Sequence, residues 1–161
     1  MAKIPIKHAI KSGSWLKCDG SYNWDGTIID YSFRIRILGF IKVMLKQIDN
    51  PQKINPKYDL TAGNFWLLKL EVVNFCKKEV YGAILKQRII LIDNEDFEFQ
   101  VIEEDHLRLY SDFANKSGLR TFYSINFIPK IKHSGSHLFF LPSDDSAEYF
   151  ISVTGGDICE V

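Results

Sequence analysis

The amino-acid sequence predicts an all-β fold, an antiparallel sandwich of seven to nine strands with at most one short helix. Isoleucine occurs 20 times against six alanines, and Phe, Tyr and Trp add 22 residues. Such β-branched and aromatic residues favour strands over helices. Short apolar runs are separated by turn-forming residues at regular intervals. This spacing is typical of a sandwich or a barrel and not of alternating β-α units.

The first half of the chain contains two long strand patterns. Apolar residues occupy every second position in residues 31–37, which predicts a half-buried strand. Gly39 interrupts the pattern and indicates a bulge or bend, after which the alternation resumes in residues 41–45. Two Asn-Pro dipeptides mark residues 50–56 as a polar loop. Residues 64–75 then alternate again, and we expect a central strand there.

The second half predicts a hairpin followed by shorter strands. Residues 84–92 and 97–101 flank the turn sequence Asp-Asn-Glu-Asp, which indicates a β-hairpin. Residues 103–117 fit one short helix or a loop with a strand. Further strands are expected at 120–128, 136–141 and 148–153. A chain of this length can bury one core. We expect a single domain over residues 1–161, with the aromatic and Gly-Asp-containing residues 1–30 packed on it.

Composition and charge exclude several classes of protein. The chain is 46% hydrophobic and carries 20 basic and 20 acidic residues. A disordered chain would have fewer hydrophobic residues and a larger net charge. A generically basic nucleic-acid binder would have a clear excess of basic residues. No stretch approaches the roughly 18 apolar residues of a membrane span. The first residues lack the apolar core of a signal peptide, so the expected location is cytoplasmic, or exported if a leader was removed.

The three cysteines, Cys18, Cys76 and Cys159, are widely spaced. Their spacing fits neither a zinc ribbon nor a Cys-x-x-Cys redox motif. Isolated thiols in a reducing compartment are the simpler interpretation. A Cys18–Cys76 disulfide stays open for an exported chain.

Three motifs carry a family resemblance that covers roughly residues 35–153. A long apolar strand, residues 65–73, ends in the turn Asn-Phe-Cys-Lys-Lys-Glu-Val; Leu-Ile-Asp-Asn-Glu-Asp-Phe follows at 91–97; and a Pro-Lys pair at 129–130 precedes the Phe-rich residues 138–142. The pattern resembles the small immunoglobulin-like domain of unknown function found in bacterial exported and lipid-anchored proteins. Lys130 stands where that family usually has Gly. The resemblance implies an immunoglobulin-like sandwich that serves as an accessory or binding module, and it carries over no functional residues.

Candidate chemical groups are few. His133 and His137 are four residues apart, but Ser-Gly-Ser between them favours a loop-to-strand position, where they would lie about 13 Å apart. His106 follows three acidic residues, which would raise the affinity of its imidazole for a proton or simply form a solvated surface. Phosphate-loop, dinucleotide and nucleophile-elbow motifs are missing from the sequence. We therefore expect no metal, no cofactor and no enzymatic activity.

An aromatic cluster near the start is the first candidate binding site. Trp15, Tyr22 and Trp24 lie among Asp and Asn side chains and two Asp-Gly pairs. Indole and phenol rings beside carboxylates could stack on sugar rings or hold an extended peptide. The alternative is that the tryptophans plug one end of the sandwich and that the Asp-Gly pairs form turns.

A basic stripe is the second candidate. Residues 1–80 hold 13 basic and 7 acidic residues, and residues 81–161 hold 7 and 13. Arg34, Arg36, Lys42 and Lys46 lie on the polar faces of successive strand segments and could bind an acidic protein or a phosphate backbone. The alternative is that basic and acidic strands pair side by side in cross-strand ion pairs.

These observations favour a non-catalytic interaction module that binds a protein partner, or a second copy of itself, through a sheet face, an edge strand or end loops. Two alternatives stay open. One is a carbohydrate-binding module that uses the N-terminal aromatic residues. The other is a β-barrel that binds single-stranded nucleic acid along the basic stripe. The zero net charge argues against the nucleic acid, and nothing in the sequence points to a small-molecule substrate.

Overall fold

The computed structural model describes residues 3–44, 56–102, 122, 126–144 and 146–153. Within these residues it contains ten strands, one α-helix and one 3-10 helix, and every pairing between strands is antiparallel. The elements in chain order are β1 (Lys3–Pro5), α1 (Ile6–Ser12), β2 (Leu16–Trp24), β3 (Thr27–Lys42), β4 (Gly63–Asn74), β5 (Val80–Tyr81), η3 (Gly82–Gln87), β6 (Ile89–Asp93), β7 (Glu98–Gln100), β8 (Asn126–Phe127), β9 (Lys132–Pro142) and β10 (Tyr149–Val153). The prediction of an all-β, antiparallel fold is confirmed, but the predicted count of seven to nine strands is too low, since the described residues contain ten, several of them only two or three residues long.

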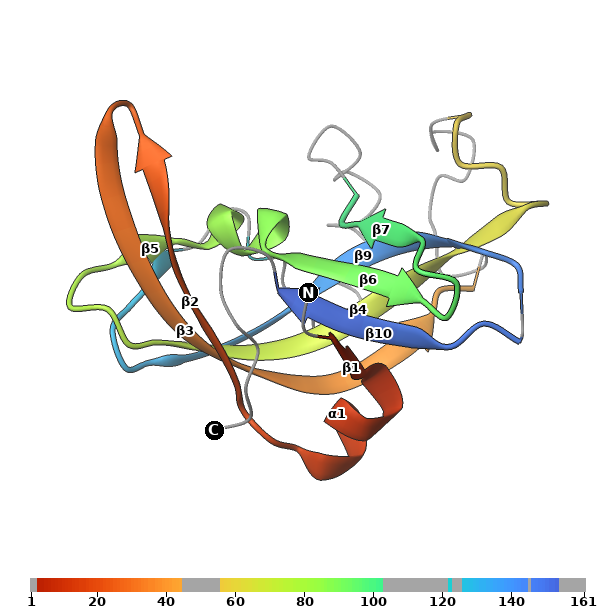
Figure 1. The fold of residues 1–161 in the computed structure, drawn as a ribbon, viewed down its shortest axis with the longest axis horizontal. Coiled ribbons are helices and arrows are strands. Elements are labelled where there is room, and N and C mark those ends of the chain that lie inside the picture. The colour runs from red at the N-terminus through yellow and green to blue at the C-terminus, as the bar shows by residue number, and fades with distance from the viewer. Residues whose placement is uncertain (1–2, 45–55, 103–121, 123–125, 145, 154–161) are drawn as a thin grey trace.

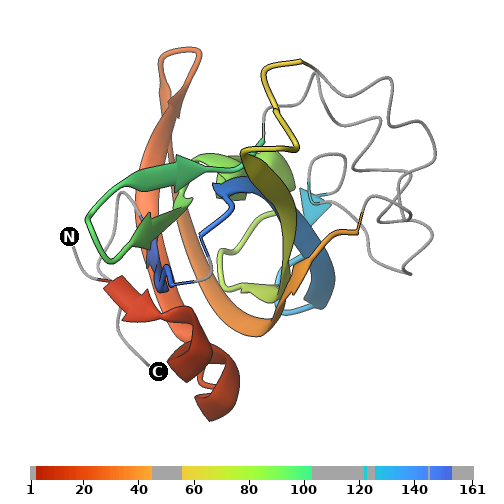
Figure 2. The same cartoon turned by 90° about the vertical axis from the view of Figure 1, so that its right-hand side faces the viewer.

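Two four-stranded sheets enclose the core. One has the strand order β2-β3-β4-β9 and the other β1-β10-β6-β7, while β5 and β8 form a small third sheet. The large sheets curl around a common interior (Figure 2). On one side they meet where the Ile102 amide, just after β7, donates to the Leu138 carbonyl of β9 at 2.9 Å. On the other side α1 connects β1 to β2, with Ile6 and Ala9 buried.

The core collects apolar side chains from both sheets. Those with 0% exposure include Ile35, Leu70, Val72, Leu91 and Ile151. Each belongs to an alternating or continuous apolar run, so the pleat of its strand turns it inward. Burying these side chains supplies the main driving force for folding.

The long strands follow the sequence pattern closely. β4 lies at the centre of its sheet, between β3 and β9, as the alternation of residues 64–75 predicts. The register of β3 against β4 shifts between Ile37 and Gly39, which confirms the expected bulge.

The hairpin of β6 and β7 is also confirmed, but its first strand is shorter than predicted. Residues 82–87 form the 3-10 helix η3, and β6 begins only at Ile89. The Asp93 carboxylate closes the turn by accepting the amides of Glu95 and Phe97, each at 2.9 Å. The sequence predicts a strand from residue 84 because Ile84 and Leu85 extend the apolar run.

The N-terminal residues build more of the sheet than the sequence suggested. Residues 16–24 are the edge strand β2, and α1 precedes them. Gly13 ends α1 in the left-handed conformation, with φ of 60°. Asp25 and Gly26 form the expected turn with φ of 50° and 82°, whereas the Asp19-Gly20 pair lies inside β2.

Some sequence predictions fall outside the described residues. They include residues 103–117 and most of the strand expected at 120–128, of which only β8 and Phe122 are described. Lys46, His106 and Cys159 lie outside as well. Among the described residues, no helix is long and apolar enough to span a membrane.

Candidate functional site

Two residues of the predicted basic stripe, Arg34 and Arg36, lie on the outer face of the sheet β2-β3-β4-β9, and acidic side chains lie beside them. Glu71 of β4 is 6% exposed and stands directly opposite Arg36 of β3. Its carboxylate accepts the Arg36 Nε–H at 2.9 Å and a second contact from the same guanidinium, and it lies 3.0 Å from the Lys132 ammonium of β9. Burial opposes the ionisation of Glu71, but the hydrogen bonds and charges of Arg36 and Lys132 outweigh it and lower the Glu71 pKa.

Arg34 belongs to a second ion-pair group on the same face. Its guanidinium lies 3.1 Å from the Asp19 carboxylate of β2, which also accepts the Ser32 hydroxyl at 2.7 Å. Lys17 contacts the same carboxylate at 3.4 Å. Burial works against the charge on Asp19, yet the Ser32 hydroxyl and the nearby cations lower the Asp19 pKa.

The basic and acidic side chains therefore pair across strands. Arg34 and Arg36 are held in ion pairs with neighbouring strands. Lys42 does not continue their stripe, because the register shift after Ile37 places it opposite Trp66, on the other face of the sheet from Arg36. Lys46 lies outside the described residues. These ion pairs do not bring the basic first half of the sequence against the acidic second half, since Arg34, Arg36, Asp19 and Glu71 all belong to residues 1–80. Arg34 and Arg36 therefore do not form an uninterrupted cationic surface.

The three N-terminal aromatic residues do not form one surface. The Trp15 ring lies 4.6 Å from the Arg36 guanidinium, on the outer face of the sheet. Tyr22 and Trp24 lie on the other face of β2, because their even positions match those of the buried Leu16 and Cys18. Nine residues of extended chain place Trp24 about 30 Å from Trp15. Only Tyr22 and Trp24 share a face.

The strongest candidate for an interaction site is a two-stranded projection, residues 19–32, which we call the arm. Strand β3 pairs with β4 only from Phe33 onward, so the preceding residues of β3 pair with β2 alone. The arm extends beyond the rest of the molecule at the upper left of Figure 1. Trp24 and Ile28, near its tip, are each 64% exposed. Both are far more exposed than the apolar side chains at the base.

Contacts on both edges fix the base of the arm. On the β2 edge, the Arg88 guanidinium donates to the Ser21 carbonyl at 3.4 Å and lies 5.4 Å from the centre of the Tyr31 ring. On the β3 edge, the Ser32 amide donates to the Cys76 Sγ at 3.0 Å. The Tyr31 ring stacks on Phe33 in the core, with centroids 5.3 Å apart. The arm is thus anchored at its base and exposed at its tip.

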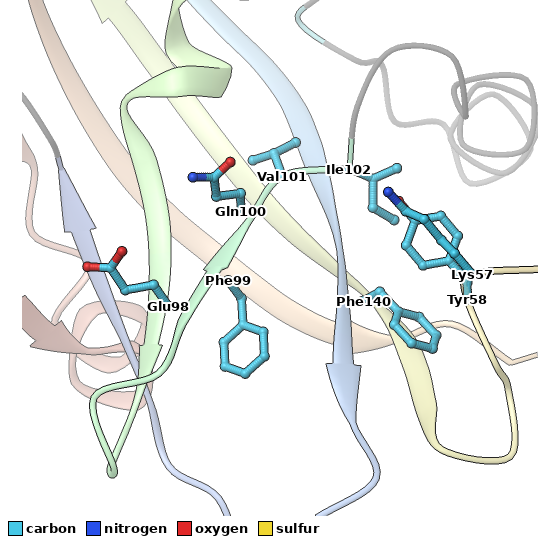
Figure 3. Close-up of a pocket in the computed structure, with 8 residues that line it drawn as sticks. All are labelled: Lys57, Tyr58, Glu98, Phe99, Gln100, Val101, Ile102 and Phe140. Atoms are coloured by element: carbon cyan, nitrogen blue, oxygen red, sulfur yellow. The ribbon is translucent and has the colours of Figure 1, made fainter. Parts of the chain in front are cut away.

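A surface cleft is a second candidate. It has a volume of about 410 Å³ and lies where β7 approaches β9 (Figure 3). Its lining combines aromatic and aliphatic side chains with three polar ones: Lys57, Tyr58, Glu98, Phe99, Gln100, Val101, Ile102 and Phe140. Sequence reasoning missed this cleft because its residues come from three distant segments, and no local motif marks any of them.

Histidines and cysteines provide no metal centre among the described residues. His133 and His137 both lie in β9, and the His133 Nε2 accepts the Ile128 amide at 3.2 Å. His137 is buried beside Phe122, with ring centroids 5.6 Å apart. Cys18 and Cys76 are free thiols, and burial raises the pKa of Cys18 to about 12.

Comparison with known proteins identifies a structure with a similar fold but indicates no activity. No protein-family model matches the chain, and no curated protein matches it either. The chain is similar to a crystal structure described as a conserved hypothetical protein from Bacillus anthracis, with a TM-score of 0.53 and 10% sequence identity. The match covers 91% of this chain and 95% of the other. At this identity the similarity concerns the fold alone.

Proposed function

We propose that this protein is a non-catalytic interaction module that binds a partner protein through the arm. The observation that carries the proposal is the exposure of Trp24 and Ile28, 64% each, on a projection that is fixed at its base. Aromatic side chains are enriched at protein interfaces relative to the rest of the protein surface. Tryptophan in particular supplies much of the binding energy at protein interfaces.

The anchoring of the arm supports the same function. Arg88 and Cys76 hold its two edges, and Tyr31 packs into the core beneath it. A recognition element that is ordered before it meets its partner loses less conformational entropy on binding. The base of the arm is therefore ordered before a partner binds.

The charge of the arm disfavours a dimer in which two arms meet. Residues 19–32 contain three aspartates and no Lys, Arg or His. Asp19 is neutralised by Arg34 and Lys17, but Asp25 and Asp30 are exposed. Two arms brought together would repel each other.

Two further predictions accompany this function. We propose an immunoglobulin-like sandwich as the more specific form of the fold, and it is supported by the left-handed φ of 63° at Lys130, where the immunoglobulin-like domains that the sequence resembles usually have Gly. We also keep the cytoplasmic location as a prediction. Neither property is needed for the arm to act as described.

The proposal is tested by comparing complex formation for matched variants of the full chain. Tagged wild-type protein, Trp24→Ala and Phe97→Ala are produced in the native cells, and their apparent mass is measured by size-exclusion chromatography of the extract. Phe97 is a matched control because it is 62% exposed in the turn between β6 and β7. We expect the wild type and Phe97→Ala to elute in one larger complex and Trp24→Ala to elute as a monomer.

The purified partner is then recombined with each variant to measure affinity. Trp24→Ala should weaken binding by about 30-fold, the loss typical of a central interface tryptophan. A wild-type protein that elutes as a monomer, or a complex that survives Trp24→Ala unchanged, would overturn the proposal. A complex made only of copies of this chain would replace it with self-association.

A further inference from the structure

The side chains on the two faces of the arm differ in polarity, and this difference indicates which kind of partner surface each face fits. The inference rests on the proposed function, since it concerns the same site. The register of the hairpin pairs Trp24 with Thr27 and Tyr22 with Ile29. These side chains share the face of Cys18 and Phe33, which are buried in the core. We call this the inner face.

The opposite, outer face carries polar and acidic groups around one apolar side chain. Ile28 pairs with Asn23, and Asp30 pairs with Ser21. Ile28 is 64% exposed, and Ser21, Asn23 and Asp30 are exposed as well. Because Trp24 and Ile28 point to opposite faces, a flat partner surface could cover only one of them. Burying both requires a partner that contacts the arm from two sides.

The positions of the charged side chains on the arm indicate which side of the partner is basic and which is apolar. Asp25 lies at the tip, in the turn, and Asp30 lies on the outer face beside Ile28. The inner face has no charged side chain beyond the buried base, where Arg88 lies against Tyr31. Complementary interfaces place opposite charges against each other and apolar groups against aromatic anchors.

We infer that the arm inserts into a groove of a partner protein. The groove has an apolar wall that receives the Trp24 indole, and a floor and opposite wall that carry Lys or Arg side chains facing Asp25 and Asp30. In this arrangement the carboxylates and the indole affect different rate constants. The two carboxylates speed association by electrostatic attraction, and the indole slows dissociation once it is buried.

Photo-crosslinking from each face tests the two-sided geometry. p-Benzoylphenylalanine is placed at Thr27 on the inner face, at Ser21 on the outer face, or at Glu95 as a control in the turn between β6 and β7. That turn lies at the opposite side of the molecule from the arm (Figure 1). The full chain is irradiated in the native cells, and the crosslinked peptides are mapped by mass spectrometry.

We expect Thr27 and Ser21 to crosslink to one and the same partner and Glu95 to give no crosslink to it. Peptides joined to Ser21 should contain Lys or Arg close to the attachment point, and those joined to Thr27 should be mainly apolar. A partner that crosslinks from one face only, or a Ser21 site without nearby basic residues, would refute the groove.

Binding kinetics with the purified partner test the charges separately from the indole. Reversing both carboxylates, in Asp25→Lys with Asp30→Lys, should lower the association rate constant at least tenfold at low salt and reverse its salt dependence, so that added salt speeds association. Glu95→Lys should leave the rate unchanged. If Trp24→Ala abolishes the complex while the double reversal changes nothing, the proposed function stands and the charged groove is wrong. If Trp24→Ala has no effect, both fail.

Discussion

Replacing Glu71 by glutamine is expected to destabilise the fold by about 1.5 to 2 kcal/mol at pH 7. The carboxylate is 6% exposed and contacts the Arg36 guanidinium and the Lys132 ammonium. Hydrogen bonds to charged groups contribute about 1.5–3 kcal/mol in proteins. The lower part of that range applies here, because the side chains of Arg36 and Lys132 are 31% and 55% exposed and solvent screens them.

The loss of stability in Glu71→Gln should be larger at pH 7 than at pH 3. The pKa of Glu71 is lower in the folded protein than its ordinary value of 4.5. A carboxyl group with a lowered folded pKa contributes its full stabilisation above the unfolded pKa and loses it as the pH falls through the folded pKa. The difference in stability between wild type and Glu71→Gln should therefore be largest above about pH 5 and should narrow towards pH 3.

Urea unfolding followed by far-ultraviolet circular dichroism measures this difference at both pH values. For a domain of this size the change corresponds to a melting temperature lower by about 3–8 °C. Glu95→Gln is the matched control, because Glu95 is exposed in a turn and should change stability by less than about 0.5 kcal/mol. A difference between wild type and Glu71→Gln that is the same at pH 7 and pH 3 would refute the role assigned to the charge.

Three further predictions concern single sites. Lys130→Gly should stabilise the fold by about 0.5 kcal/mol in urea unfolding, because Lys130 has a φ of 63° that glycine adopts without strain; lower stability would contradict this. Gly63→Ala should destabilise it by about 1–3 kcal/mol, since a Cβ there would lie 2.7 Å from the Phe140 ring and 2.8 Å from the Leu141 carbonyl oxygen; an unchanged unfolding midpoint would contradict this. Buried Cys18, whose pKa is raised to about 12, should react with a thiol reagent far more slowly than Cys76 in the native protein; equal rates by mass spectrometry would argue otherwise.

The sequence predicted the parts of the fold that depend on local alternation. The central strand β4 and the bulge at Gly39 follow from the pattern of apolar residues within one segment. The turn between β6 and β7 follows from Asp93 and its neighbours, which supply the hydrogen bonds that close it. In each case the residues that determine the structure are adjacent in the chain.

The candidate site was less predictable because it depends on contacts between distant segments. Trp15 and Trp24 are close in the sequence, but an extended strand separates them and turns them to opposite faces. The acidic partners of Arg34 and Arg36 are set by strand register, which periodicity alone does not define. The arm arises because β4 ends at Asn74 while β3 begins six residues before its pairing with β4.

The different surroundings of the three tryptophans give the protein three separate optical reporters. Trp24 is 64% exposed, so its fluorescence should be the most red-shifted and the first to be quenched by acrylamide. The Trp15 ring lies 4.6 Å from the Arg36 guanidinium and reports on the outer face of the sheet. Trp66 stacks on Phe40 with ring centroids 4.7 Å apart, and reports on the part of β4 that pairs with the end of β3. Single-tryptophan variants would therefore follow the arm, the ion pairs and the sheet independently during unfolding.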